Sequence, residues 1–175
     1  MKKQLIAILL LFPFCQICAQ QISMPKWFYQ VFSQNRLNEK FEVKNMLKPG
    51  YLEADFNGDG IKDIAVMVQE KKNHKIGIVL IHGGTFQYLV FGAGNPMGKV
   101  EFSETDNLKW MNGWKVYSDK IAYQTKFNNG EIVGSYKRKL SNNAISLWAL
   151  EDGEPVAGGL IVWNGKKYIW IHQGE

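Results

Sequence analysis

The chain has little cysteine, and both cysteines lie near its start. Cys15 and Cys18 fall within the opening segment MKKQLIAILLLFPFCQICAQ, so residues 20–175 contain none. This segment starts with lysines, continues with a short apolar run and reaches the small residue Ala19, which is the pattern of a cleaved secretory signal. We therefore predict a signal peptide over residues 1–19 and a secreted or periplasmic mature protein without disulfides.

Long apolar runs and strong charge are also missing. After the predicted signal, no segment reaches the roughly 18 consecutive apolar residues that suit a spanning helix, so we expect no stable membrane span. Removing Lys2 and Lys3 lowers the formal net charge from +5 to +3. This mild charge, together with export, argues against nucleic acid as a partner. The expected partner is an extracellular or periplasmic protein or a glycan.

Internal repeats, low-complexity segments and dividing linkers are absent from the mature sequence. A chain of 175 residues fits one domain. Because 46% of its residues are hydrophobic, a disordered chain is excluded. We expect residues 20–175 to form a single α+β domain.

The mature sequence opens with a helical pattern over residues 25–39. Pro25 suits a first helical turn. Four apolar side chains recur at helical spacing and form one stripe, which predicts a helix laid on a sheet: Trp27, Phe28, Val31 and Phe32.

Strand patterns follow, and a first strand over residues 51–55 leads into an acidic run. Three further runs predict an antiparallel meander with short turns, and they cover residues 63–70, 75–84 and 85–94. Apolar residues occupy both faces of the segment 63–70, so this strand should be buried on both sides.

The second half is harder to interpret, and we expect a long loop or broken segment over residues 95–125. Strands are predicted over 115–127 and 130–139, joined by the turn sequence NNG, and over 143–150. The clearest hairpin is GLIVWNGKKYIWIH, residues 159–172. A two-residue type I′ turn at Asn164-Gly165 would place Trp163 opposite Lys166, Ile161 opposite Tyr168 and Leu160 opposite Ile169.

The segment DFNGDGIKD, residues 55–63, concentrates oxygen donors. Three carboxylates this close repel one another unless a cation neutralises them. Hard oxygen donors without nearby cysteine or histidine suit calcium better than zinc or magnesium. We predict one calcium site, with Gly60 allowing the turn that directs a backbone carbonyl toward the ion. The expected ligands are Asp55, Asn57, Asp59, Ile61 by its carbonyl, and Asp63.

An EF-hand is excluded because its twelfth loop position needs a bidentate glutamate, whereas this chain has Val66 there. An EF-hand loop also lies between helices, and here both flanks have strand patterns. One alternative remains, in which Asp55 and Asp63 only cap a tight turn and the other side chains are solvated.

The segment DFNGDGIKDIAV resembles the calcium loop of FG-GAP or VCBS-type repeats, which occur in integrin-like β-propellers. The resemblance covers residues 51–70 and implies a strand–loop–strand hairpin around one calcium ion, with the five ligands given above. One copy in a chain of this length does not make a complete propeller. The end of the chain is also similar to that of small secreted bacterial proteins that carry one such loop.

We therefore predict a mainly antiparallel β-sheet fold with an N-terminal helix, and a calcium-binding domain with a binding or structural role and no catalysis. One alternative is a carbohydrate-binding module that uses exposed tryptophans, for which Trp110 and Trp114 are the candidates. Another is a small extracytoplasmic hydrolase that uses Glu104 and Asp106. The three histidines have no Cys or Ser partner at a recognisable spacing, and no G-x-S-x-G motif is present.

Overall fold

The computed structural model describes residues 23–97 and 106–174. Strand makes up 51% of the structure and helix 11%, so the predicted α+β class, dominated by antiparallel sheet, is confirmed. The described part of the chain contains no closed barrel or propeller. The predicted signal peptide, residues 1–19, lies outside the described residues. Within them, no helix is long and apolar enough to cross a membrane.

The N-terminal helix forms where its apolar stripe predicts it. Helix α1 spans Lys26–Gln34, and a short helix α2 spans Leu37–Lys40. The predicted continuous helix over 25–39 is interrupted because Arg36 adopts a left-handed conformation with φ 55°. Phe28 and Phe32, both from the predicted stripe, are buried.

The first sheet contains the predicted meander. Its strands are β1 (Phe41–Val43), β2 (Tyr51–Ala54), β3 (Asp63–Glu70), β4 (Ile76–Ile81) and β5 (Tyr88–Gly92). They pair antiparallel in the order β1-β3-β4-β5, and β2 also pairs with β3. The meander is therefore confirmed, with β4 and β5 shorter than their sequence patterns.

Strand β3 lies between two hydrophobic cores, one on each of its faces. Ile64, Val66 and Val68 pack in one core with the buried residues of α1 and α2. Ala65 and Met67 face the other way, into the core shared with the second sheet. This alternation confirms the prediction of a strand buried on both sides.

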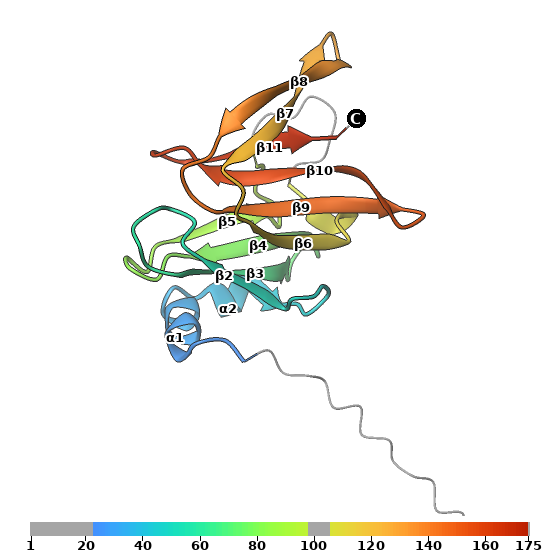
Figure 1. The fold of residues 1–175 in the computed structure, drawn as a ribbon. Coiled ribbons are helices and arrows are strands. Elements are labelled where there is room, and N and C mark those ends of the chain that lie inside the picture. The colour runs from blue at the N-terminus through green and yellow to red at the C-terminus, as the bar shows by residue number, and fades with distance from the viewer. Residues whose placement is uncertain (1–22, 98–105, 175) are drawn as a thin grey trace, which may run out of the picture.

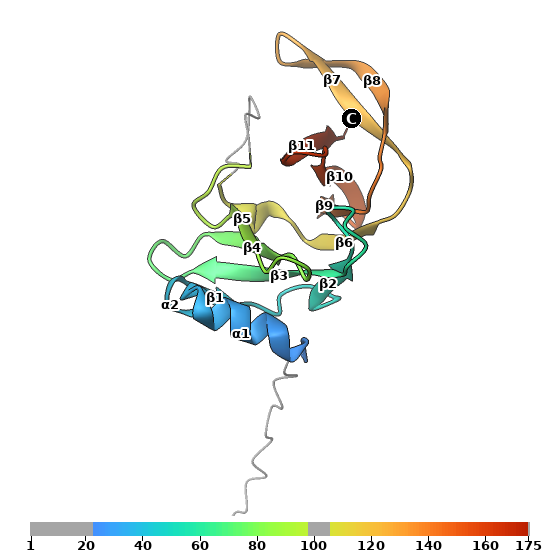
Figure 2. The same ribbon diagram turned by 90° about the vertical axis from the view of Figure 1, so that its left-hand side faces the viewer.

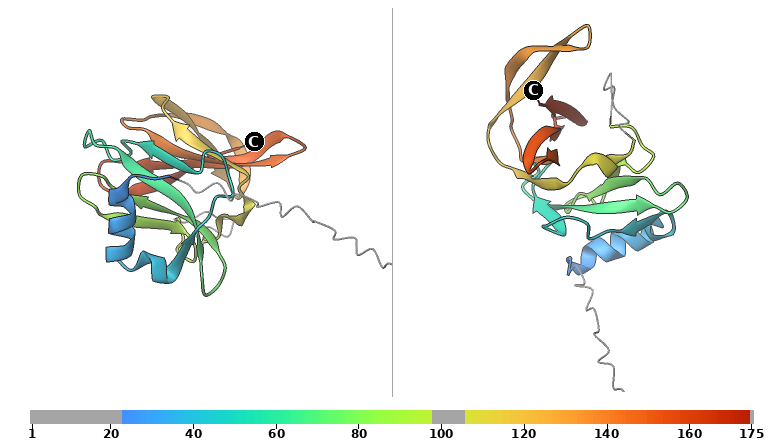
Figure 3. Two further views of the ribbon diagram at one scale, coloured as in Figure 1. Left: turned by 90° about the horizontal axis from the view of Figure 1, so that it is seen from below. Right: turned by 90° about the vertical axis from the view of Figure 1, so that its right-hand side faces the viewer.

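The second sheet has the order β11-β10-β9-β6 and lies against the first. Its strands are β6 (Gly113–Tyr117), β9 (Ala144–Glu151), β10 (Glu154–Trp163) and β11 (Tyr168–Gln173); a 3-10 turn, Leu108–Trp110, precedes β6. Figure 1 shows the helices, the first sheet and the second sheet stacked as successive layers. Figure 3 shows the helical layer from below.

The β10–β11 hairpin forms where predicted, but its predicted turn and register are wrong. Trp163 pairs with Tyr168, and Ile161 pairs with Trp170. The loop is four residues long because the Asn164 side chain accepts hydrogen bonds from the backbone N–H groups of Lys166 and Lys167, both at 3.0 Å. Since the register differs by two residues, each side chain keeps its predicted face.

Strands β7 (Ile121–Asn128) and β8 (Glu131–Lys139) form a separate two-stranded hairpin. The single strand predicted over 115–127 is therefore wrong, because its first part joins the second sheet and its second part leaves it. Figure 2 shows this hairpin arching over the outer face of the second sheet. A small core seals its base: Ala122, Leu140, Ala144, Leu160, Val162 and Ile171.

Candidate functional site

The acidic loop connects β2 to β3, as the sequence predicts. It leaves β2 just after Ala54 and enters β3 at Asp63, and those two residues are partners in the ladder. Gly58 and Gly60 have φ values of 85° and 83°, which favour glycine. The glycines therefore allow the eight residues 55–62 to close a hairpin that presents several oxygen donors.

Asp63 anchors the loop to the core. Its side chain is fully buried, and its two oxygens accept hydrogen bonds from the backbone N–H groups of Phe56 at 2.9 Å and Gly83 at 3.1 Å. Burial raises the pKa of the Asp63 carboxyl; these two hydrogen bonds oppose the rise, and the nearby charge of Asp59 adds to it. The residue thus joins its own loop to the β4–β5 turn.

The other donors lie in the exposed part of the loop and are oriented by its backbone. Asp55 accepts hydrogen bonds from the backbone N–H groups of Gly58 at 2.6 Å and Gly60 at 2.9 Å. Asp59 accepts one from the N–H of Ile61 at 2.8 Å, which, with a further bond from the Asn57 amide, lowers the pKa of the Asp59 carboxyl.

The donor set fits calcium in chemical type, because its members are hard oxygen donors. Each carboxylate oxygen that accepts one hydrogen bond keeps a second lone pair for a cation. Among the described residues, no group of three or more His, Cys, Asp or Glu side chains lies close enough together to hold a metal ion. An ion in this loop would therefore depend on Asn57 and the Ile61 carbonyl as well as on the carboxylates.

The loop also touches the second sheet. The Asn143 amide donates to the backbone carbonyl of Asp55 at 3.3 Å. A Cβ atom at Gly58 would lie 2.6 Å from the Asn142 side chain, so this part of the loop packs closely against the segment that precedes β9. The acidic loop consequently contacts elements of both sheets.

A histidine and a tyrosine form a polar pair beside the loop. His82, which is 5% exposed, has its Nε2 atom 3.0 Å from the hydroxyl of Tyr168. Burial raises the pKa of Tyr168, and the charges of Asp63, Asp55 and Asp59 raise it further. The start of β11 is therefore within electrostatic reach of the loop, a neighbour that sequence reasoning did not identify.

The predicted tryptophan platform is wrong. Trp114 is 1% exposed, and its indole N–H donates to the carbonyl of Pro49 at 2.8 Å. Trp110 is half-buried and packs against the same core, with its ring 6.3 Å from that of Trp170. Because Trp114 faces the first sheet, the two residues do not share an exposed surface.

Of the two carboxylates of the predicted hydrolase, the structure describes only Asp106. Asp106 forms an ion pair with Lys75, and Glu104 lies outside the described residues.

Two aromatic residues that were not predicted as site residues, Trp148 and Tyr123, line a cleft. This cleft lies on the face of the second sheet that points away from the core between the sheets. The alternation of side chains along its strand indicates that Trp148 lies on one face of a sheet. The position of Trp148 beside a cleft depends on the pairing of distant strands, which the sequence does not show.

No family model matches the chain, and searches of curated proteins and of solved structures found no protein that matches it. The resemblance of residues 51–70 to FG-GAP and VCBS-type repeats therefore stays a prediction that rests on the residues of the loop.

Proposed function

We propose that the mature protein is a secreted or periplasmic domain that binds one calcium ion in the loop 55–63 and has a binding or structural role without catalysis. The observation that carries this proposal is the loop itself, whose nine residues 55–63 include three carboxylates and one amide where two paired strands are connected. The residues that would hold the ion are Asp55, Asn57, Asp59, Ile61 by its carbonyl, and Asp63.

The contacts of the loop indicate what the ion would do. The loop contacts the β4–β5 turn through Asp63 and the segment before β9 through Asp55. Its charges repel one another, and residues 20–175 have no cysteine to cross-link the chain. An ion that binds only the folded form would therefore hold the two sheets together at this point.

The expected stabilisation is modest. Extracellular modules bind calcium with a Kd of about 10⁻⁴ to 10⁻³ M. At millimolar free calcium, such a site adds about 1 kcal/mol to the free energy of unfolding. For a domain of this size, that gain raises the melting temperature by about 3 °C.

A thermal melt of the mature protein with calcium and with a chelator tests the proposal. We expect calcium to raise the melting temperature of the native protein and to have no effect on Asp59→Ala, because that change removes an exposed donor. Asp119→Ala is the matched control, since it removes an exposed carboxylate outside the loop and should keep the calcium response. An unchanged melting temperature in the native protein would refute the site.

A further inference from the structure

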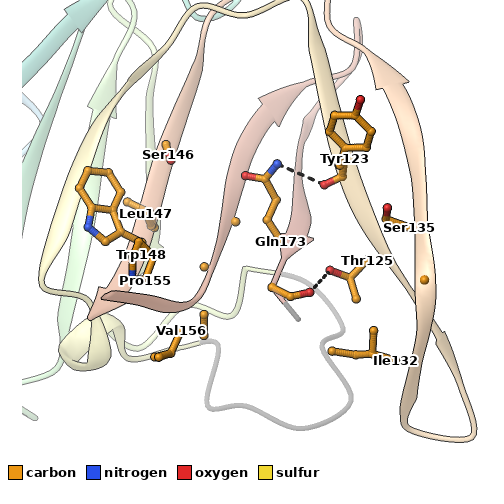
Figure 4. Close-up of a pocket in the computed structure, with 15 residues that line it drawn as sticks. Tyr123, Thr125, Ile132, Ser135, Ser146, Leu147, Trp148, Pro155, Val156 and Gln173 are labelled. Carbon is orange, nitrogen blue, oxygen red and sulfur yellow. Dashed lines mark hydrogen bonds between the residues drawn. The ribbon is translucent and has the colours of Figure 1, made fainter. Parts of the chain in front are cut away.

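A cleft of about 1020 Å³ separates the β7–β8 hairpin from the outer face of the second sheet. Figure 4 shows Trp148 of β9 and Tyr123 of β7 on opposite sides of this cleft. Two hydrogen bonds close its end near the C-terminus: Gln173 donates to the Tyr123 carbonyl at 3.1 Å, and Thr125 donates to the Gly174 carbonyl at 3.0 Å. Its volume is at the upper end of the range typical of small-molecule sites.

The pairing of the strands places Trp148 between two glycines on the outer face of the second sheet. Trp148 pairs with Gly113 of β6 on one side and with Gly158 of β10 on the other. A Cβ atom at Gly113 would lie 2.1 Å from the Trp148 ring, so the indole lies directly over this glycine. Because both strand partners are glycines, the half-buried ring can lie against the sheet without meeting a neighbouring side chain. Tyr123, which is 52% exposed, faces the same cleft.

The polar groups of the cleft are hydroxyls and an amide. Ser146 lies on its floor, Ser135 and Thr125 come from the hairpin, and Gln173 lies at its end. The described residues that line the cleft include no Lys, Arg, Asp, Glu or His. Lys115 is not part of this lining, but its ammonium lies over the Trp148 ring, 5.9 Å from the ring centre. A ligand of the cleft would thus meet aromatic and uncharged hydrogen-bonding groups.

The floor cannot accept an added peptide strand. It belongs to β9 and β10, and their backbones already pair with each other and with β6 and β11. Peptide recognition by strand addition needs unpaired backbone groups at a sheet edge. Only side chains are therefore available on the floor, so the floor favours a ligand that stacks on a ring and hydrogen-bonds at its periphery.

We propose that this cleft binds a neutral oligosaccharide, with Trp148 and Tyr123 contacting the sugar rings and the serine, threonine and glutamine groups contacting the hydroxyls. A pyranose ring has an apolar C–H face and a polar edge, which matches an aromatic surface bordered by hydroxyls. This proposal deepens the binding role proposed above and supplies its ligand class. The cleft lining contains none of residues 55–63, so it is a separate site.

The test is a glycan array carrying neutral and acidic oligosaccharides, probed with the labelled mature protein, followed by calorimetric titration of the retained glycans. We expect neutral glycans to be retained in preference to acidic ones. Trp148→Ala should weaken binding about tenfold or more, which corresponds to about 1.4 kcal/mol. Ser135→Trp, at an exposed strand position, should block the cleft without removing a core side chain.

Tyr136→Ala is the matched control, because it removes an exposed aromatic residue of β8 that does not line the cleft. It should leave the affinity unchanged. The proposal is overturned if no neutral glycan is retained, if acidic glycans or extended peptides bind better, or if both Trp148→Ala and Ser135→Trp bind normally. The melting experiment with calcium tests only the acidic loop, and the glycan experiments test only the cleft. A negative result for one proposed site is therefore distinguishable from a negative result for the other.

Discussion

Strands β3 and β8 have similar lengths and opposite surroundings. The first six residues of β3 are buried, whereas eight of the nine residues of β8 are exposed. Among the described residues, β3 lies between the helices and the second sheet, whereas β8 pairs only with β7 and contributes no residue to the buried cores. Strand β3, buried on both faces, therefore contributes to the stability of the fold. Strand β8 leaves its apolar side chains exposed, where they are available for contacts with a ligand or partner.

The largest expected difference concerns one isoleucine in each region. Ile78 on β4 is fully buried in the core between the sheets, and Ile132 on β8 is 42% exposed. Ile78→Ala should lower the free energy of unfolding by about 3 kcal/mol because it removes buried methyl groups and leaves a cavity. Ile132→Ala should lower it by less than about 0.5 kcal/mol. Urea unfolding measures both values. Similar losses of free energy would contradict the claim that the core contributes much more to stability than β8.

The next effect concerns the buried end and the exposed middle of the acidic loop. Without calcium, Asp63→Ala should cost about 2 kcal/mol, because it leaves the buried N–H groups of Phe56 and Gly83 without their acceptor. Asp59→Ala, in the exposed part, should cost less than about 0.5 kcal/mol under the same conditions. Chelator-treated protein in a urea titration gives both values. Equal costs would mean that Asp63 does not anchor the loop.

The support of Trp148 allows a coupled test. Gly113→Ala should cost about 1 to 3 kcal/mol, since the added methyl group would overlap the indole. Combining it with Trp148→Ala removes the overlap, so the double variant should be about 1 kcal/mol more stable than the sum of the single changes predicts. A double-mutant cycle by urea unfolding measures this coupling, and additive costs would contradict the close approach of ring and backbone.

The smallest expected effect is a pH dependence at His172. Burial lowers the pKa of His172, so the folded protein binds this proton less readily than the unfolded chain does. Stability should therefore be highest above about pH 6.5 and fall as the pH drops toward the lowered pKa. Unfolding midpoints at pH 7.5 and pH 5 should differ less in His172→Gln than in the native protein. His74→Gln, at an exposed turn, should keep the native difference; equal slopes in all three would exclude the effect.

The sequence was sufficient for features that depend on local pattern. The stripe of α1, the two faces of β3 and the hairpin position of the acidic loop follow from helical spacing, strand alternation and glycine placement. The loop's contacts with Gly83 and Asn143 were not predictable, because they depend on how the two sheets pack.

Features that depend on partners were missed. Trp114 appeared exposed because its neighbours in sequence are polar, yet pairing of β6 with β9 places it opposite Leu147 in the core. The register of β10–β11 was missed because the Asn164 side chain widens the turn by two residues. The position of Trp148 beside the cleft was not predictable, because its glycine neighbours, Gly113 and Gly158, lie on other strands.

The most direct test of the calcium loop follows its backbone amides by NMR while calcium is added to the metal-free protein. We expect saturable shifts for Gly58, Gly60 and Ile61, whose N–H groups bond to Asp55 and Asp59. Phe56 and Gly83, bonded to Asp63, should shift with the same dissociation constant. If none of these five signals moves at about 10 mM calcium, well above the range of extracellular modules, the loop is only a tight turn and the proposed metal site is wrong.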